Sequence, residues 1–263
     1  DAMENGHWAT VTWGYVIMRL AMVAQWLRIA CSDPDQRATA LRYAIGITVV
    51  QSLWLARIAF DGPFQFWTFW PMVLLEIIVP VWAERSRMTP WHPHHIAERY
   101  GLLVIISLGE GVLGTIAAVQ PIIEHSGWSD DAIVLVTAGV VLTFGMWWAY
   151  FAAPFADLLH HNQRASFAFG YLHIIVFGAI AAVGAGLHVA AYVIEGEAHV
   201  GFNEAVRAVA IPVAIFLVAY FLIYSIMVRG VDVFHMVLFV IAMGFLVVAV
   251  VLTRTGTPFA LDI

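Results

Sequence analysis

Eight long apolar stretches, separated by short polar segments, dominate this sequence of 263 residues. Each stretch holds close to the ~20 residues that an α-helix needs to cross the hydrocarbon core of a bilayer. The stretches are continuous and lack the alternation of apolar and polar residues that is typical of membrane β-barrel strands. The chain is 62% hydrophobic and 11% charged, whereas soluble domains are about half apolar and about a quarter charged. We therefore predict an all-α fold, a polytopic transmembrane helical bundle.

The eight predicted spans form one transmembrane domain over residues 1–263. Because only short segments separate them, a substrate site would lie within the bundle. We expect the lipid bilayer as the main partner, a homo-oligomer or a larger membrane complex as a further one, and no nucleic acid. The spans are expected at Trp8–Ala30, Leu41–Phe60, Phe64–Trp82, Arg99–Gln120, Ala132–Phe155, Ser166–Val193, Val209–Val228 and Val233–Leu252.

Arginine placement predicts the orientation of the spans. All twelve basic residues are arginines, and the missing lysine excludes a retinal Schiff base and lysine Schiff-base catalysis. Segments rich in basic residues stay in the cytoplasm, which favours a cytoplasmic location for the segments after the first, third, fifth and seventh spans. The arginines on that side are Arg28, Arg37, Arg42, Arg85, Arg87, Arg99, Arg164 and Arg229, against Arg57, Arg207 and Arg254 on the other.

Four polar residues are expected inside the membrane: Glu110, Arg19, Glu76 and His173. A charge at that depth is costly unless it is paired or neutral, so each is a candidate functional residue. In one interpretation, Arg19 is neutralised by Glu110 or Glu76 in an ion pair that fixes helix packing. In the other, Glu110, Glu76 and His173 form a pathway for protons or a cation, since carboxyl and imidazole groups exchange protons. Both interpretations place Glu110 on a face of its helix that is directed into the bundle.

A resemblance to a known family is carried mainly by the fourth span. The sequence resembles the bacterial low temperature requirement A (LtrA) proteins in two nearby segments. These are His95-Ile-Ala-Glu98-Arg99-Tyr100-Gly101-Leu-Leu and Leu108-Gly109-Glu110. The segment Gly170-Tyr171-Leu-His173 and the dipeptide Gly14-Tyr15 agree with it. The resemblance implies a multi-pass protein of the bacterial inner (plasma) membrane that is linked to growth in the cold, and it implies no agreed biochemical activity.

The dipeptide Gly14-Tyr15 recurs as Gly170-Tyr171, each time in a span that precedes a polar segment and two closely spaced spans. This recurrence indicates either a partial internal repeat, as in many transporters, or a chance match. The acidic-aromatic and Trp-rich spans with which LtrA proteins usually begin are not in the sequence. We therefore expect that preceding N-terminal spans are lacking. Small residues at every fourth position, Gly178, Ala182, Gly186 and Ala190, predict a flat face for close helix packing in the sixth span.

Charged and histidine residues gather at the start of the fourth span. His95, Glu98 and Arg99 are predicted to form the cytoplasmic mouth of a pathway. Four further histidines are candidate metal ligands, because imidazole binds zinc and similar ions. Their spacing matches no ligand motif, so we expect neither a metal nor a cofactor. These four are His92, His94, His160 and His161.

The residues favour one functional hypothesis and leave two others open. The favoured one is transport of a proton, an ion or a small polar solute through the bundle. The first alternative is a structural or accessory subunit of a larger membrane complex, and the second is an intramembrane enzyme that modifies lipids. The sequence has no HExxH, GxSxG or Gly-rich nucleotide motif, so an enzyme is the less favoured class and no catalytic residue is assigned.

Overall fold

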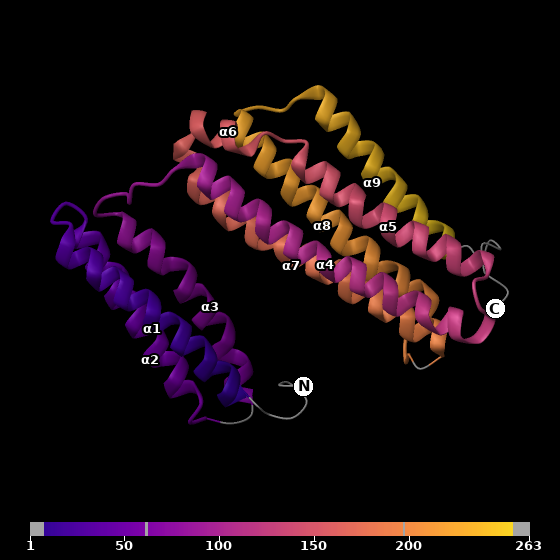
Figure 1. Cartoon of the computed structure of the whole chain (residues 1–263), viewed down its shortest axis with the longest axis horizontal. Helices are drawn as coiled ribbons and strands as arrows, with labels where there is room; N and C mark the ends of the chain where they lie inside the picture. Colours follow the sequence, from indigo (N-terminus) through magenta and orange to yellow (C-terminus); the bar gives the residue numbers. More distant parts are fainter. Residues whose placement is uncertain (1–7, 61–62, 197, 255–263) are drawn as a thin grey trace. The chain divides into compact units, whose positions relative to one another are not determined.

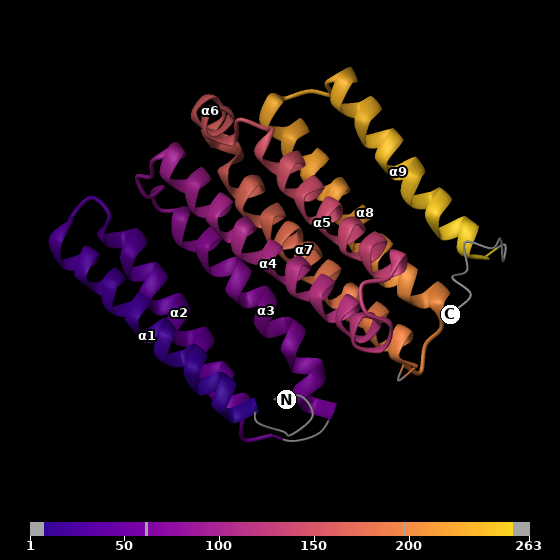
Figure 2. The ribbon, with the colours of Figure 1, turned by 45° about the vertical axis from the view of Figure 1, so that its right-hand side comes forward.

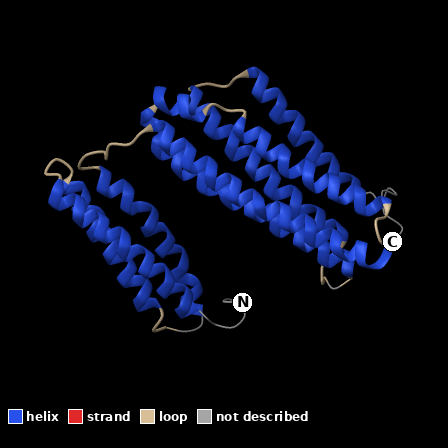
Figure 3. Ribbon diagram, viewed as in Figure 1, coloured by secondary structure: helices blue, strands red, loops and turns tan. Residues whose placement is uncertain are grey.

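The computed structural model describes residues 8–60, 63–196 and 198–254 (Figure 1). Figure 3 shows that every regular element in these ranges is a helix. All eight predicted spans are found as helices of 21 to 34 residues, so the predicted all-α fold is confirmed. The elements are α1 (Trp8–Ser32), α2 (Arg37–Arg57), α3 (Pro63–Glu84), α4 (Pro93–Ser126), α5 (Asp130–Phe151), the short α6 (Phe155–His161), a single 3-10 turn (Gln163–Ala165), α7 (Ser166–Glu195), α8 (Phe202–Val228) and α9 (Val233–Arg254).

Seven helices in the described ranges are long and apolar enough to cross a membrane. α2 is not among them, because Arg37, Arg42 and Gln51 interrupt its apolar sequence. Backbone N–H and C=O groups find no partners in hydrocarbon, and a helix pairs them within itself. The length and composition of these helices therefore define a multi-pass membrane protein.

Several helix ends differ from the predicted boundaries for local reasons. α4 begins at Pro93 rather than at Arg99, since proline suits the first turn of a helix, where its missing N–H is not needed. α4 continues to Ser126 and ends before Gly127, whose positive φ of 70° suits glycine. The fifth span is split, because α5 ends at Phe151 and Pro154 precedes the separate helix α6.

The chain folds into two compact units, residues 1–90 (the N-terminal unit) and residues 91–263 (the C-terminal unit). In the N-terminal unit, α2 packs against both α1 and α3. Ile47, Val50, Trp54 and Val79 form its buried core. Gly46 allows Val79 to approach α2, because a Cβ at position 46 would lie 2.9 Å from a Val79 methyl group. The single domain expected over residues 1–263 stays a prediction.

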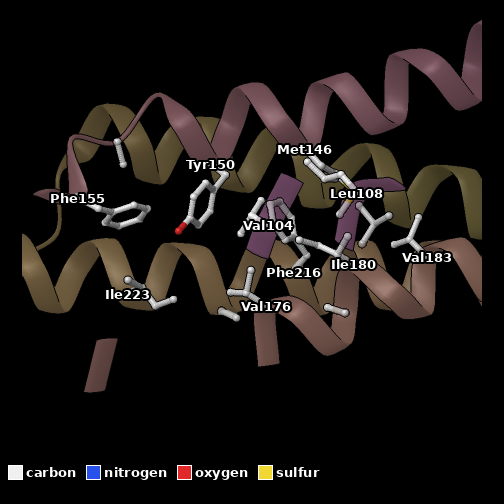
Figure 4. Close-up of a cluster of buried hydrophobic side chains, with 14 of the residues drawn as sticks. Val104, Leu108, Met146, Tyr150, Phe155, Val176, Ile180, Val183, Phe216 and Ile223 are labelled. Carbon is white, nitrogen blue, oxygen red and sulfur yellow. The ribbon is translucent and has the colours of Figure 1, made fainter. Parts of the chain in front are cut away.

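In the C-terminal unit, α7 contacts both α4 and α8, α5 packs on α4, and α9 packs on α8. Figure 2 shows these helices from a second side. Val104, Met146, Val176, Ile180 and Phe216 belong to the apolar core of this unit (Figure 4). Hydrogen bonds of Asn162, which follows α6, join this segment to the C-terminal end of α8. The Asn162 side chain donates to the carbonyl oxygen of Ile226 at 3.1 Å and accepts from Arg229 at 3.0 Å.

Glycines of α7 bring its backbone against the neighbouring helices. A Cβ at Gly186 would collide with the backbone of Ala208 in α8, and a Cβ at Gly184 would lie 2.7 Å from the carbonyl oxygen of Glu110 in α4. At Gly178, by contrast, no atom lies within 4 Å of the position of a Cβ. The small-residue face predicted for this helix therefore packs closely at Gly186, while Gly178 borders open space.

This difference predicts opposite outcomes for two matched substitutions. Gly186→Ala forces α7 and α8 apart and should destabilise the protein by about 1–3 kcal/mol, the usual cost of overpacking. Gly178→Ala only replaces glycine by a better helix former and should be neutral or stabilise by up to ~1 kcal/mol. Unfolding in mixed detergent micelles measures both. Equal effects of the two substitutions would contradict the close α7–α8 contact.

Candidate functional site

The N-terminal unit holds an ion pair deep within its helices. Arg19 lies near the middle of α1, eleven residues from its first residue and thirteen from its last. Its Nη2 donates to Oε2 of Glu76 in α3 at 3.0 Å. The side chains are 22% and 13% exposed, respectively. Of the two partners predicted for Arg19, the structure selects Glu76, and this pair satisfies the need for charge compensation at that depth.

Two further side chains complete what we call the Arg19 cluster, namely Tyr15, Arg19, Gln51 and Glu76. Gln51 of α2 donates from Nε2 to Oε1 of Glu76 at 2.7 Å. Arg19 donates from Nε and Nη2 to the Tyr15 hydroxyl at 2.9 and 2.6 Å. Sequence analysis missed Gln51 and Tyr15. The available signals were an amide inside an apolar helix and the four-residue spacing of Tyr15 and Arg19, which places them on one helix face.

One side-chain atom of this cluster and one atom of a nearby tryptophan are buried and form no hydrogen bond with the residues that the structure describes. They are Oε1 of Gln51 and Nε1 of Trp54, one helical turn apart on α2. The orientation of the Gln51 amide follows from its partner, since a carboxylate oxygen accepts and the amide nitrogen must donate. Each unsatisfied buried group costs roughly 1–3 kcal/mol. Two buried polar groups of α2, one of them close to the C-terminal end of the helix, are therefore left without a hydrogen bond in the described part of the N-terminal unit.

Glu110 lies at the centre of α4, seventeen residues after its first residue and sixteen before its last. At 1.5 Å per residue, each end is about 25 Å away. Its side chain is exposed, and within the C-terminal unit it forms no hydrogen bond or ion pair with any described residue. The interior-facing positions of this helix are instead occupied by Val104, Leu108 and Thr115. Within this unit, Glu110 lies at the edge of that buried face: its Cβ and its carbonyl oxygen lie against α7 at Gly184, while the residue as a whole is exposed. The expectation that its carboxyl group points into the bundle stays a prediction.

His173 of α7 is completely buried in the C-terminal unit. Its Nδ1 lies 2.7 Å from the carbonyl oxygen of Phe169, and its Nε2 lies 2.9 Å from the Tyr150 hydroxyl. A carbonyl oxygen only accepts, so Nδ1 carries the proton. In the neutral ring that burial favours, Nε2 then accepts from Tyr150. The imidazole thus ties α5 to α7 and has both nitrogens occupied.

The structure separates His173 from Glu110. The backbone of Glu110 meets α7 at Gly184, eleven residues after His173, which is about 16 Å along the helix. The rings of Tyr100, Phe155, Phe169 and Phe177 surround the imidazole at centroid distances of 4.8, 6.0, 4.2 and 5.7 Å. Glu110 therefore lies at mid-depth, whereas the buried His173 lies nearer the start of α7.

The residues predicted for the cytoplasmic mouth lie together on the first two turns of α4. Nδ1 of His95 and Oε2 of Glu98 are 3.6 Å apart, with both side chains largely exposed, and Arg99 is exposed next to them. The ring of His92 lies 5.7 Å from that of His94 and 5.0 Å from that of His95 between centroids.

The histidine candidates do not form a metal site in the described part of the chain. No group of three His, Cys, Asp or Glu side chains there is arranged to hold a metal ion. His160 and His161 lie edge to face at 5.6 Å, and Nδ1 of His161 is 2.7 Å from the carbonyl oxygen of Asp157 in its own helix. This contact fits a helix end, where histidine side chains bond the last carbonyl groups.

These features define a polytopic α-helical membrane protein. Its long apolar helices can cross a bilayer, and they carry an ion pair, a carboxyl group and a buried histidine away from their ends. A family model described as bacterial low temperature requirement A protein (LtrA) matches residues 1–263. The chain belongs to this family, and the resemblance seen in the fourth span is confirmed. No curated protein and no solved structure matches the chain.

The Arg19–Glu76 pair predicts a strongly non-additive double-mutant cycle. Arg19→Met and Glu76→Leu each leave one charge unpaired and should each destabilise the protein by about 1–3 kcal/mol, less than the roughly 3–5 kcal/mol of a fully buried pair because both groups are partly exposed. The double variant removes both charges and should be less destabilised than the sum of the two single variants, with a remaining loss of about 1–3 kcal/mol from the Gln51 amide that Glu76 no longer accepts from. Single effects that simply add in the double variant would show that the two residues do not compensate each other.

Proposed function

We propose that this LtrA family protein moves a proton, an ion or a small polar solute across the membrane, and that Glu110 is the group that binds and releases it. The observation that carries the proposal is the position of Glu110: an exposed carboxyl group at the midpoint of α4 with no partner in its own unit. A carboxyl group at this depth is neutral while it holds its proton and needs water or a cation when it loses it.

The distribution of charges supports this role over a purely structural one for Glu110. A structural carboxylate in the membrane would need a basic partner. Arg19, the arginine near the middle of a span, is bonded to Glu76 and to Tyr15 within the N-terminal unit. The structural interpretation therefore fits Glu76, and Glu110 remains available for exchange.

The local backbone also suits an exchange group. The contact between Gly184 and the backbone of Glu110 fixes where the side chain begins. On the N-terminal side of Glu110, no atom lies within 4 Å of the position of a Cβ at Gly109. A fixed backbone beside open space would allow the side chain to change rotamer without moving the helix.

The remaining predicted residues take supporting roles in this proposal. The Arg19 cluster is a fixed polar site in the N-terminal unit, and His173 holds α5 to α7. His95, Glu98 and Arg99 form the charged end of α4. The excess of arginine at that end supports a cytoplasmic location for it and the bacterial inner membrane as the site of the protein.

A second candidate, a structural or accessory subunit, is favoured by α9. Residues 236–252 of this helix are apolar around its whole circumference, and none of the residues in its most apolar window is buried. Such a helix faces either lipid or another membrane protein. Its exposed side chains include Phe234, Leu238, Ile241 and Phe245.

Reconstituted vesicles test the transport proposal. A pH-sensitive dye trapped inside reports proton entry under an imposed membrane potential. The parent should show proton flux, and Glu110→Gln should reduce it to the level of protein-free vesicles, because an amide cannot release a proton. Glu124→Gln is the matched control: Glu124 is an exposed carboxylate near the end of the same helix, and its substitution should leave the flux unchanged.

Glu110→Gln with the flux of the parent would contradict the role of Glu110. A parent that transports neither protons nor sodium or potassium ions would contradict transport of a proton or a cation. A parent without flux that co-purifies with another membrane protein in a defined ratio would favour the accessory-subunit alternative. The flux and co-purification measurements both use the full chain. The elution volume of each variant in size-exclusion chromatography in detergent checks that it is folded.

A further inference from the structure

α4 and α5 pack through a reciprocal arrangement of glycine and threonine. Both helices contain Gly-x-x-x-Thr, Gly111 to Thr115 in α4 and Gly139 to Thr143 in α5. A Cβ at Gly111 would lie 2.7 Å from Oγ1 of Thr143, and a Cβ at Gly139 would collide with Thr115. Each threonine therefore occupies the space left by the glycine opposite, and these contacts fix how closely the two helices approach.

A cavity of about 110 Å³ lies at this crossing. Its lining consists of one glycine, the two threonines and otherwise hydrocarbon side chains, with Val112, Ile116 and Val119 from α4 and Val136, Val140 and Phe144 from α5. Because Thr115 and Thr143 already touch the opposite backbone, the helices cannot move together to close it.

The cavity is unsuited to water. A buried water molecule needs 2–4 polar partners, and an apolar cavity of ~150 Å³ in another protein stays dry and takes up apolar guests. The Thr115 hydroxyl donates to the carbonyl oxygen of Gly111 at 2.7 Å and is thereby satisfied within its own helix. Among the lining residues, this leaves the Thr143 hydroxyl, which lies against Gly111, as at most one partner for a water molecule that would need at least two. The lining therefore favours a hydrocarbon chain over water.

The depth of the cavity in the membrane indicates which part of a lipid molecule can reach it. α5 has 22 residues, so it is about 33 Å long and matches the hydrocarbon thickness of a bilayer. Val140 lies ten residues from its start, about 15 Å along the helix and thus near the midplane. At that depth the bilayer consists of the ends of acyl chains. Val112, Ile116, Val140 and Phe144 are exposed on the protein surface, so a chain end can enter from the lipid.

We propose that the α4–α5 cavity binds the terminal segment of a phospholipid acyl chain. The threonine–glycine contacts hold the cavity open, its lining excludes water, and its depth matches the chain end. This inference is independent of the transport proposal, since it uses no residue to which that proposal assigns a role and its readout is binding rather than flux.

Photolabelling tests the site in vesicles of phosphatidylethanolamine and phosphatidylglycerol that contain a phospholipid with a diazirine at the end of one acyl chain. Labels should concentrate on residues 112–119 and 136–144. Val140→Phe and Val112→Phe fill the cavity and should each reduce this labelling about tenfold, the factor expected when about two methylene groups lose their contact. Val141→Phe is the matched control, because Val141 is the adjacent exposed valine and does not line the cavity.

The proposal is overturned if labels spread evenly over all exposed residues of α4 and α5, or if Val141→Phe lowers the labelling as much as Val140→Phe. A second phospholipid, with the diazirine next to its headgroup, should leave the cavity unlabelled. Labelling by this second probe equal to that by the first would equally refute the assignment. Val140→Phe and Val112→Phe fill the cavity from different helices. If one of them misfolds, the other still tests the proposal.

Discussion

A charged or ionisable side chain within hydrocarbon has to be paired, neutral or hydrated, and this requirement explains most of the polar structure in this protein. Arg19 cannot lose its charge, so it needs an anion at its own depth, and Glu76 supplies it at 3.0 Å. Gln51 then bonds the second carboxylate oxygen of Glu76, and Tyr15 accepts from Arg19. The three helices of the N-terminal unit are joined by this one compensation of charge.

The C-terminal unit meets the same requirement in two other ways. His173 is neutral and fully hydrogen-bonded between Phe169 and Tyr150, so burial costs it little. Glu110 is neither paired nor buried within its unit, which leaves a bound proton as the simplest way to remain at mid-depth. The contrast between these two residues is the physical basis of the proposed function.

The sequence was sufficient for the class of fold and for the number of long helices, because apolar length alone determines a spanning helix. It predicted Glu76 only as one of two possible partners of Arg19, the other being Glu110. Which carboxylate faces Arg19 depends on the orientation of each helix about its own axis, and the apolar pattern does not determine this. It missed Gln51 for the same reason. It placed Glu110 at the middle of its helix, but the position of Glu110 at the edge of the α4–α7 contact depends on how these two helices pack. The start of α4 at Pro93 and the separate helix α6 after Pro154 were not predicted, because the apolar pattern does not reveal where proline starts or interrupts a helix.

The protonation state of Glu110 in a membrane tests this account most directly. Infrared difference spectra of reconstituted protein, recorded as the pH on one side is changed, resolve the carbonyl stretch of a protonated carboxyl group. The account predicts such a band in the parent, a change in its amplitude with pH, and its loss in Glu110→Gln. A difference band that is identical in the parent and in Glu110→Gln would show that Glu110 neither takes up nor releases a proton over the pH range used, and would contradict the account.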